Sequence, residues 1–298
     1  MGSVLVSRLP RNWLAVGAGI LLVLPRLTPA QETYADVNGV RLFYEVKGEG
    51  PPLVLIHGWA VNSEYWDDQV PAFRNKYRVL RYDRRGFGKS GGVPDMSADP
   101  ADLDLLLGKL GIEAAYVLGH SAGAQMAQGF ALTYPRRVKG LVLFGSGPVA
   151  GFSLPWSGAD ALPFGEIVRV ARTDGVQSIW KLLENHVLFS SDSLSAEQGA
   201  RMLRIQKSYR GADLLSQIQF SRPEALASLA RLHEIKSPTL VVTGDKEAPY
   251  LKVFAETIAY AIPNATRLVL PGGGHLINMS RPVAFNAAVL DFLAGLDR

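Results

Sequence analysis

The feature of this chain that most constrains its fold is a series of short, mainly apolar runs separated by longer stretches with helical patterning. Short apolar runs are typical of strands buried on both faces, as they are in a parallel sheet. The six runs are Leu53–Ile56, Tyr77–Tyr82, Ala115–Leu118, Gly140–Phe144, Thr239–Thr243 and Thr266–Leu270. Helices are expected at Glu64–Phe73, Pro100–Leu110, Ala122–Tyr134, Tyr250–Tyr260 and Val283–Leu296. This order predicts an α/β protein.

Two further strands are predicted ahead of this series. Thr33–Val37 and Val40–Val46 flank Asn38-Gly39, a dipeptide that favours a type I′ hairpin because both residues tolerate positive φ. The predicted sheet therefore has eight strands and is mostly parallel, with an antiparallel hairpin at its start and helices on its faces.

The interval between the strands ending at Phe144 and starting at Thr239 is about 90 residues long. A loop of that length without secondary structure is uncommon in a compact domain. Helical patterning at Ile179–Leu188 and Ala200–Tyr209 instead predicts an inserted helical cap from about Gly147 to Lys236. Five aromatic residues of the cap are candidates for the wall of an apolar pocket, although any one of them is more often a packing residue. They are Trp156, Phe164, Trp180, Phe189 and Phe220.

The first thirty residues have the layout of a secretory signal peptide. Arg8 and Arg11 form a basic region, Trp13–Leu24 is an apolar run of twelve, and small residues precede Gln31. We expect cleavage after Ala30 and export of residues 31–298 to the periplasm or the medium. The alternative is an uncleaved N-terminal membrane anchor, but twelve apolar residues are fewer than the roughly 20 that span a bilayer.

Charge and cysteine content exclude several function classes. The formal net charge is +4, and +3 of it comes from Arg8, Arg11 and Arg26 in the segment expected to be removed. The remainder is nearly balanced, so no basic surface for nucleic acid is expected. The chain has no cysteine, which excludes thiolate nucleophiles, disulfides and cysteine-bound metals. We therefore expect a small-molecule substrate as the partner.

The strongest candidate for chemistry is Ser121, in the sequence Gly119-His120-Ser121-Ala122-Gly123 between an expected strand and an expected helix. This is the G-x-S-x-G nucleophile elbow in the context that it requires. Its glycines permit a sharp turn that exposes the serine hydroxyl above the edge of the sheet. Ser121 is therefore the predicted nucleophile.

A serine nucleophile needs a base and an acid, and both are expected after later strands. His275 follows the last strand in a glycine-rich loop and is the predicted base. The acid, which orients the imidazole and stabilises its charged form, is expected in Thr243–Pro249. Asp245 and Glu247 are both candidates in that segment, and Asp245 lies where it could instead cap the turn.

An oxyanion hole is predicted where the strand Leu53–Ile56 runs into His57-Gly58-Trp59. The backbone N–H groups of Trp59 and Ala122 would point at the negative charge that develops on the substrate. No two histidines have the i, i+4 spacing of a helical metal site, so neither a metal nor a cofactor is predicted.

Together these features resemble the α/β-hydrolase fold superfamily, and within it the esterase-like members that carry a cap. The similarity covers residues 31–298 and includes Tyr82–Ser90, which looks like the D-x-R-G-x-G-x-S loop of that group. The resemblance implies an eight-stranded, mostly parallel sheet with an inserted helical cap. It also places the acid three positions after Gly244, at Glu247, and leaves Asp245 as the alternative.

The reaction predicted on these grounds is hydrolysis of a small or medium ester-like substrate through an acyl-enzyme. Related dehalogenases and epoxide hydrolases carry aspartate at the elbow, and Ser121 argues against both activities. A lactone hydrolase or a carbon–carbon bond hydrolase would use the same triad and remains an alternative. A receptor that binds a ligand without turnover is the alternative from another class, although a pure binder has no need for all three catalytic residues.

Overall fold

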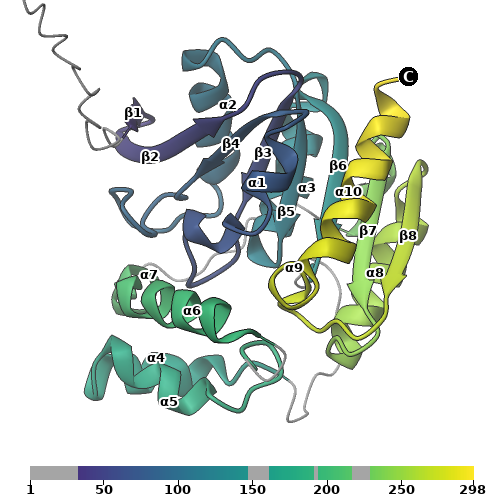
Figure 1. Ribbon diagram of the computed structural model, residues 1–298. Coiled ribbons are helices and arrows are strands. Elements are labelled where there is room, and N and C mark those ends of the chain that lie inside the picture. The colour runs from purple at the N-terminus through teal and green to yellow at the C-terminus, as the bar shows by residue number, and fades with distance from the viewer. Residues whose placement is uncertain (1–32, 147–160, 191–193, 217–228) are drawn as a thin grey trace, which may run out of the picture. The chain divides into compact units, whose positions relative to one another are not determined.

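The strands cross the sheet nearly in chain order, so the first and last strands lie at opposite edges. The computed structural model describes residues 33–146, 161–190, 194–216 and 229–298. The strand order is β1-β2-β4-β3-β5-β6-β7-β8 (Figure 1). The pairs β1–β2 and β2–β4 are antiparallel, and all the remaining pairs are parallel. The strands are β1 Thr33–Val37, β2 Val40–Lys47, β3 Pro52–Ile56, β4 Arg78–Tyr82, β5 Ala115–His120, β6 Val138–Phe144, β7 Thr239–Gly244 and β8 Ala265–Leu270. This topology confirms the predicted eight-stranded, mostly parallel sheet.

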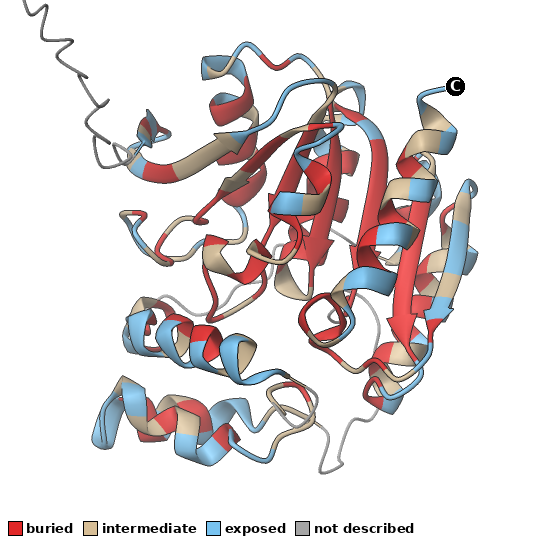
Figure 2. Cartoon of the chain, in the orientation of Figure 1, coloured by how far each residue is buried: buried red, intermediate tan, exposed pale blue. Residues whose placement is uncertain are grey.

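Alternation of side chains along each strand builds two apolar layers, one on each face of the sheet. Along β3, Val54 and Ile56 pack into one core cluster, whereas Leu53 and Leu55 pack into the other. The central strands are buried throughout, whereas β8 at one edge is largely exposed (Figure 2). This pattern explains why the central strands are continuous apolar runs in the sequence.

Helices cover both faces of the sheet. Helices α2 Asp99–Lys109, α3 Ala122–Thr133 and α8 Pro249–Ala261 pack on one face, and α1 Val70–Phe73 and α10 Pro282–Leu296 pack on the other. The short helix α9 Ile277–Ser280 precedes α10, and 3-10 turns lie at η1 Ser63–Trp66, η2 Pro135–Arg137, η3 Val176–Ser178 and η4 Leu229–Glu234. In the described part of the chain, no helix combines the length and apolarity needed to cross a membrane.

The hairpin predicted at the start of the sheet is confirmed. Asn38 and Gly39 have φ values of 46° and 74°, as a type I′ turn requires at its two central positions. Thr33 pairs with Tyr44, and Val37 pairs with Val40. The signal peptide predicted at residues 1–30 lies outside the described ranges.

The single helix predicted over Glu64–Phe73 is wrong, because the structure has η1 and the short α1 there. Asn62 caps η1 by accepting a hydrogen bond from the backbone N–H of Glu64. Pro71 has no N–H to donate to the carbonyl of Asp67, and its ring would clash with that carbonyl in a continuous helix. The proline therefore begins α1 instead of continuing a helix from Glu64.

The described residues between β6 and β7 form four α-helices: α4 Phe164–Thr173, α5 Ile179–Leu183, α6 Ala196–Ser208 and α7 Ala212–Leu215. Helix α6 begins earlier than the patterning predicts because Ser195 and Gln198 form a capping box. Helix α5 is shorter than predicted, and α4 was not predicted. From here on, the described residues of this interval are called the cap.

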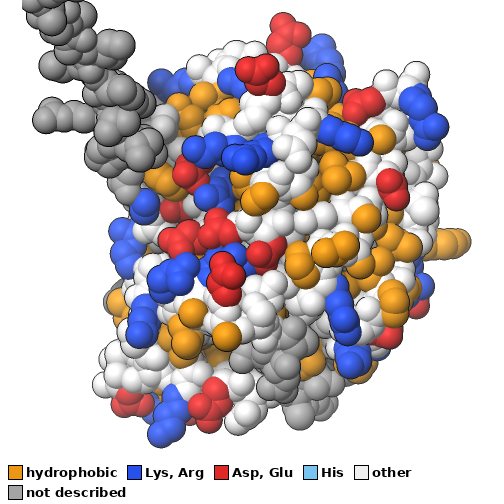
Figure 3. All heavy atoms as spheres, viewed as in Figure 1, with side chains coloured by type: hydrophobic (Ala, Val, Ile, Leu, Met, Phe, Trp, Pro, Cys, Tyr) orange, Lys and Arg blue, Asp and Glu red, His pale blue; other side chains and the backbone are white. Residues whose placement is uncertain are grey.

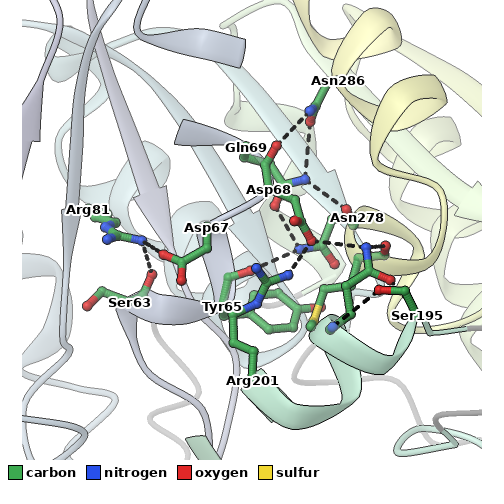
Figure 4. Close-up of polar contacts among 12 residues, drawn as sticks. Ser63, Tyr65, Asp67, Asp68, Gln69, Arg81, Ser195, Arg201, Asn278 and Asn286 are labelled. Atoms are coloured by element: carbon green, nitrogen blue, oxygen red, sulfur yellow. Dashed lines mark hydrogen bonds and ion pairs between the residues drawn. The ribbon is translucent and has the colours of Figure 1, made fainter. Parts of the chain in front are cut away.

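Helix α6 of the cap is attached to the loop between η1 and α1, and to α9, by partly buried polar contacts (Figure 4). Arg201 forms an ion pair with Asp68, and the carboxamide of Gln198 donates to the Met279 carbonyl oxygen at 2.6 Å. Behind Asp68, the side chains of three buried amides bond to one another and to the backbone. They are Gln69, Asn278 and Asn286. On the outer surface, acidic and basic side chains are mixed over the face shown in Figure 3.

Candidate active site

The predicted nucleophile lies at a strained turn between β5 and α3. Ser121 has φ 53° and ψ −120°, a conformation that is uncommon for a residue with a side chain. Its backbone N–H donates to the Phe144 carbonyl oxygen on β6 at 3.0 Å, which holds the turn against the sheet. Backbone strain of this kind persists only where the surroundings enforce it, and it is concentrated at functional sites.

The two glycines of the elbow are needed because backbone crosses close to both. A Cβ atom on Gly119 would lie 2.5 Å from the Gly123 carbonyl oxygen. A Cβ atom on Gly123 would lie 2.4 Å from the carbonyl oxygens of Ile56 and His57. Both distances are shorter than real Cβ contacts, so only glycine lets α3 start this close to β3.

The structure brings His275 and Glu247 together. The Nδ1 atom of His275 is 3.1 Å from Oε2 of Glu247, and both side chains are buried. The other carboxylate oxygen of Glu247 accepts the Ala248 N–H at 2.9 Å, which fixes the carboxylate plane. With Nδ1–H donated to the carboxylate, Nε2 of His275 is the atom left to accept a proton from Ser121. Both Ser121 and His275 line the same cavity.

Asp245, the alternative acid, lies elsewhere. It is exposed, and Oδ1 accepts the Gly272 N–H at 2.7 Å, so its carboxylate caps the turn that starts the His275 loop. Its backbone carbonyl oxygen accepts from Nζ of Lys252 at 2.7 Å. The geometry therefore favours Glu247 as the partner of His275 and gives Asp245 a role in shaping the loop.

The loop that carries the predicted oxyanion donor lies directly against the elbow. A Cβ atom on Gly58 would be 3.2 Å from Cβ of Ser121 and 3.0 Å from Nδ1 of His120. Glycine at this position lets the backbone of Trp59 approach the serine. Trp59, Ala122, Ser121 and His275 all line one cavity, as the predicted oxyanion hole and triad require.

His120 packs under the loop that carries His275 and is buried. Its Nε2 atom lies 3.2 Å from the His275 carbonyl oxygen, and its ring stacks on Tyr65 and Phe144 with centroid distances of 4.8 and 4.6 Å. Burial and then the nearby His275 lower the pKa of His120 well below its ordinary value of 6.5. A neutral His120 supports the backbone of His275 without placing a second positive charge beside it.

The cavity above Ser121 has a volume of about 540 Å³ and is mostly apolar. That volume lies within the range of roughly 300–1,000 Å³ that is usual for small-molecule sites. Its apolar walls include Val61, Leu162, Phe164, Leu188, Phe189 and Phe254. Of the cap aromatics named from the sequence, Phe164 and Phe189 line it, Trp180 packs on Phe189 with centroids 5.7 Å apart, and Trp156 and Phe220 lie outside the described residues.

The loop that follows β3 and carries Trp59, the predicted oxyanion donor, is called the oxyanion loop from here on. His57 is held neutral by its contacts in this loop. Its Nε2 atom accepts the Arg84 N–H at 2.9 Å, so Nδ1 must be the atom that donates to the Gly58 carbonyl oxygen at 2.8 Å. Burial, with a smaller effect of Arg84, lowers the pKa of His57 to about 3.

We therefore expect the folded protein to lose stability as the pH falls from about 6.5 towards 3. In that window the unfolded chain binds a proton at His57 that the folded chain excludes, which changes the free energy of unfolding by about 1.4 kcal/mol per pH unit. Urea denaturation between pH 5 and 8 should show a shallower pH slope for His57→Gln than for the wild type. His233→Gln is the matched control because His233 is exposed. An unchanged slope in His57→Gln would refute this account.

Sequence reasoning missed the cap residue that contacts the oxyanion loop. Asp213 is buried, and its Oδ2 accepts the indole N–H of Trp59 at 2.6 Å across 154 positions of sequence. No motif surrounds this aspartate, and its segment carries no pattern that distinguishes it from other acidic residues of the cap. Only the fold reveals the contact.

Comparison with known proteins gives matches over most of the chain. A family model described as the alpha/beta hydrolase fold matches residues 51–282. The chain is 29% identical over 266 residues to the putative carbamate hydrolase RutD of Caulobacter sp. (strain K31), a match that covers 85% of this chain and 96% of the relative. It is 30% identical over 271 residues to the 2-hydroxy-6-oxononadienedioate/2-hydroxy-6-oxononatrienedioate hydrolase of Paraburkholderia phymatum, covering 85% of this chain and 91% of the relative.

A solved structure has a similar fold. The crystal structure of the enol-lactonase from Burkholderia xenovorans LB400 is similar with a TM-score of 0.72 and 25% sequence identity, covering 88% of this chain and 100% of that chain. The activities in the names of these proteins differ from one another, so their common features are the fold and hydrolysis.

Proposed function

The chain belongs to the α/β-hydrolase fold family, and we propose that it is a serine hydrolase that cleaves a small or medium ester-like substrate through an acyl-enzyme. The observation that carries the proposal is the buried contact of 3.1 Å between Nδ1 of His275 and Glu247, in a loop that faces the same cavity as Ser121. A ligand-binding receptor has no need of an oriented imidazole beside a strained serine.

The proposed reaction begins with attack of the Ser121 hydroxyl oxygen on the substrate carbonyl carbon, while Nε2 of His275 takes the hydroxyl proton. The bond to the leaving alcohol then breaks, and the imidazolium returns that proton to the departing oxygen. A water molecule repeats the two steps on the acyl-enzyme and releases the carboxylic acid. Glu247 stabilises the imidazolium, and the N–H groups of Trp59 and Ala122 stabilise the oxyanion.

The cavity supports a neutral, apolar acyl group. Phe164, Phe189 and Phe254 are among the residues that form its walls, and no lysine or arginine is found among the described residues that line it. A carboxylate placed against such walls would lose its hydration without a compensating charge from those residues. The name of the carbon–carbon hydrolase among the relatives denotes a dicarboxylic acid. We therefore favour an uncharged ester over a substrate of that kind.

A lactone is the second candidate, supported by the similarity to the enol-lactonase. A lactone is a cyclic ester, so it would react through the same acyl-enzyme, with the alcohol remaining attached to the acyl group. The proposed roles of Ser121, His275 and Glu247 would be unchanged.

Two measurements test the proposed function together. A fluorophosphonate probe should label the protein once, at Ser121, as peptide mass spectrometry would show. The p-nitrophenyl ester of octanoic acid should be hydrolysed with a kcat/KM at least about 100-fold above that of the mono-p-nitrophenyl ester of octanedioic acid, which has the same chain length and a terminal charge.

Absence of labelling, or no turnover of any ester, would contradict the proposal of a serine hydrolase. Labelling with equal kcat/KM for the two esters would retain the nucleophile and refute the neutral acyl group. A series of lactones in the same assay would separate the second candidate, since only a lactonase would prefer the ring ester to the open ester.

A further inference from the structure

The backbone that carries the proposed oxyanion donor is strained at the residue after Trp59. Ala60 has φ 59°, in the left-handed region that residues with a Cβ atom rarely adopt. Ala60 is 1% exposed and belongs to a buried apolar cluster with Ile167, Leu183 and Leu214 of the cap helices. Because such a conformation persists only where the surroundings enforce it, packing of the cap helps to hold this loop.

The side chain of Trp59 is bound by the cap as well. Its indole N–H donates to Oδ2 of Asp213 at 2.6 Å, and the hydroxyl of Tyr209 donates to Oδ1 at 2.5 Å. The carboxylate is 3% exposed, so both of its oxygens are occupied away from water. Hydrogen bonds to a charged acceptor are short and strong, and burial increases their effect. Burial and then the Asp213 charge raise the pKa of Tyr209, so its phenol keeps the proton that it donates.

Three aromatic rings surround the indole and restrict its remaining movement. The centroids of Phe164, Phe189 and Tyr209 lie 5.8, 6.1 and 5.7 Å from that of Trp59. With the hydrogen bond to Asp213, these contacts fix both the position and the tilt of the indole. The backbone N–H of Trp59 is one bond away from the Cα atom that carries this side chain.

We infer that Asp213 is a positioning residue that holds Trp59, through its indole, in the orientation in which its backbone N–H stabilises the oxyanion. The cap thereby takes part in catalysis as well as in enclosing the cavity. The inference rests on the proposed function, because it assigns a partner to the oxyanion donor of that reaction. Donors in such a site act by being oriented before the charge develops, so loss of orientation lowers the rate.

The cap keeps a second attachment when this one is removed. Helix α6 is bound through the ion pair of Arg201 with Asp68 and through the bond from Gln198 to the Met279 carbonyl oxygen (Figure 4). A change at Asp213 is therefore expected to loosen the oxyanion loop without releasing the cap. This separation makes the positioning role testable.

The test compares Trp59→Phe, Asp213→Leu and the double variant with the wild type on one neutral ester. Leucine has about the size of aspartate but has no oxygen to accept the indole N–H of Trp59. Phenylalanine keeps the backbone N–H and an aromatic ring but cannot donate to Asp213. Each single variant should lower kcat by about 10–100-fold, less than the 10²–10³-fold lost when an oxyanion donor is removed outright, and should change KM by less than about threefold. The double variant should be no slower than the slower single one, because both changes break the same hydrogen bond.

A boronic acid that mimics the tetrahedral intermediate provides a second readout. Its affinity should fall in proportion to kcat in Asp213→Leu, which a loss of general stability would not produce. Glu166→Gln is the matched control, since it breaks an exposed ion pair with Arg169 on α4 and should leave kcat unchanged. If Asp213→Leu fails to fold, Trp59→Phe decides the question.

A kcat within twofold of the wild type in Trp59→Phe would overturn the inference. So would an additive loss in the double variant, because additive effects would mean that the two residues act separately. A wild type that hydrolyses no ester would instead contradict the proposed function. If the wild type is active and these substitutions leave kcat unchanged, the proposed triad stands and only the role of Asp213 is refuted.

Discussion

Ser121→Ala is expected to lower kcat for ester hydrolysis by about 10⁵-fold or more, the scale seen when a triad serine is removed elsewhere. The proposed mechanism has no other nucleophile at the elbow, and water would have to attack the substrate directly. Alanine has the same Cβ atom as serine, so it meets the same backbone strain at φ 53° and should leave the fold intact. Circular dichroism and thermal unfolding should therefore match the wild type.

The control for this variant is Ser146→Ala. Ser146 lies just after β6 and is 1% exposed, and its hydroxyl has no hydrogen-bond partner among the described residues. Fluorophosphonate labelling should disappear in Ser121→Ala and persist in Ser146→Ala. A purified Ser121→Ala protein that retains more than about a tenth of the wild-type kcat would refute the nucleophile, because removal of a triad serine costs orders of magnitude more.

Glu247→Gln is the variant with the second largest expected effect, a loss of up to about 10⁴-fold in kcat. Glutamine keeps the shape of the side chain, but it cannot stabilise a positive imidazolium, and its NH₂ group can favour the wrong tautomer of His275. KM for a neutral ester should change little, because the lost interaction is strongest in the transition state.

Asp245→Asn is the comparison that makes the Glu247 result specific. The Asp245 carboxylate accepts the Gly272 N–H at 2.7 Å, and an asparagine side-chain oxygen can accept the same bond. We expect this variant to lose much less activity than Glu247→Gln at equal thermal stability. The opposite ranking would transfer the acid to Asp245 and leave Ser121 and His275 in their proposed roles.

The central part of this fold was predictable because local signals and burial agree there. The apolar runs that become β3, β5, β6 and β7 are buried on both faces, so their composition alone marks them as strands. The elbow around Ser121 was predictable for a similar reason. A Cβ atom on either of its two glycines would lie less than 3 Å from neighbouring backbone, so the sequence must carry glycine there.

Other parts depended on features that composition does not carry. In the predicted helix at Glu64–Phe73, the apolar pattern concealed the effect of Pro71, which ends one turn and starts another. Helix α4 was missed although it is amphipathic, because Pro163 and Gly165 near its start look like loop residues. At Pro71 the proline outweighs the periodicity around it, whereas in α4 the periodicity outweighs the proline and the glycine.

In the site as well, some residues could be predicted from the sequence and others could not. The resemblance to the family indicated Glu247, three positions after Gly244, as the acid, and the structure places it against His275. The choice over Asp245 needed the fold, because both carboxylates lie in one short loop and only their three-dimensional surroundings separate them. The contact of Asp213 with Trp59 could not be predicted from the sequence, because it forms only when the cap packs on the oxyanion loop.

The position of β8 at the edge of the sheet has a consequence for the order in which activity and the fold are lost on heating. Ser121 follows β5, which is buried along its whole length, whereas His275 follows β8, where Thr266, Arg267 and Val269 are exposed. Edge strands open locally at a lower free energy than the centre of a sheet, which opens only with global unfolding. We therefore expect His275, the proposed base, to lose its support at a temperature at which Ser121, the proposed nucleophile, is still held, so that loss of activity on heating precedes loss of the fold.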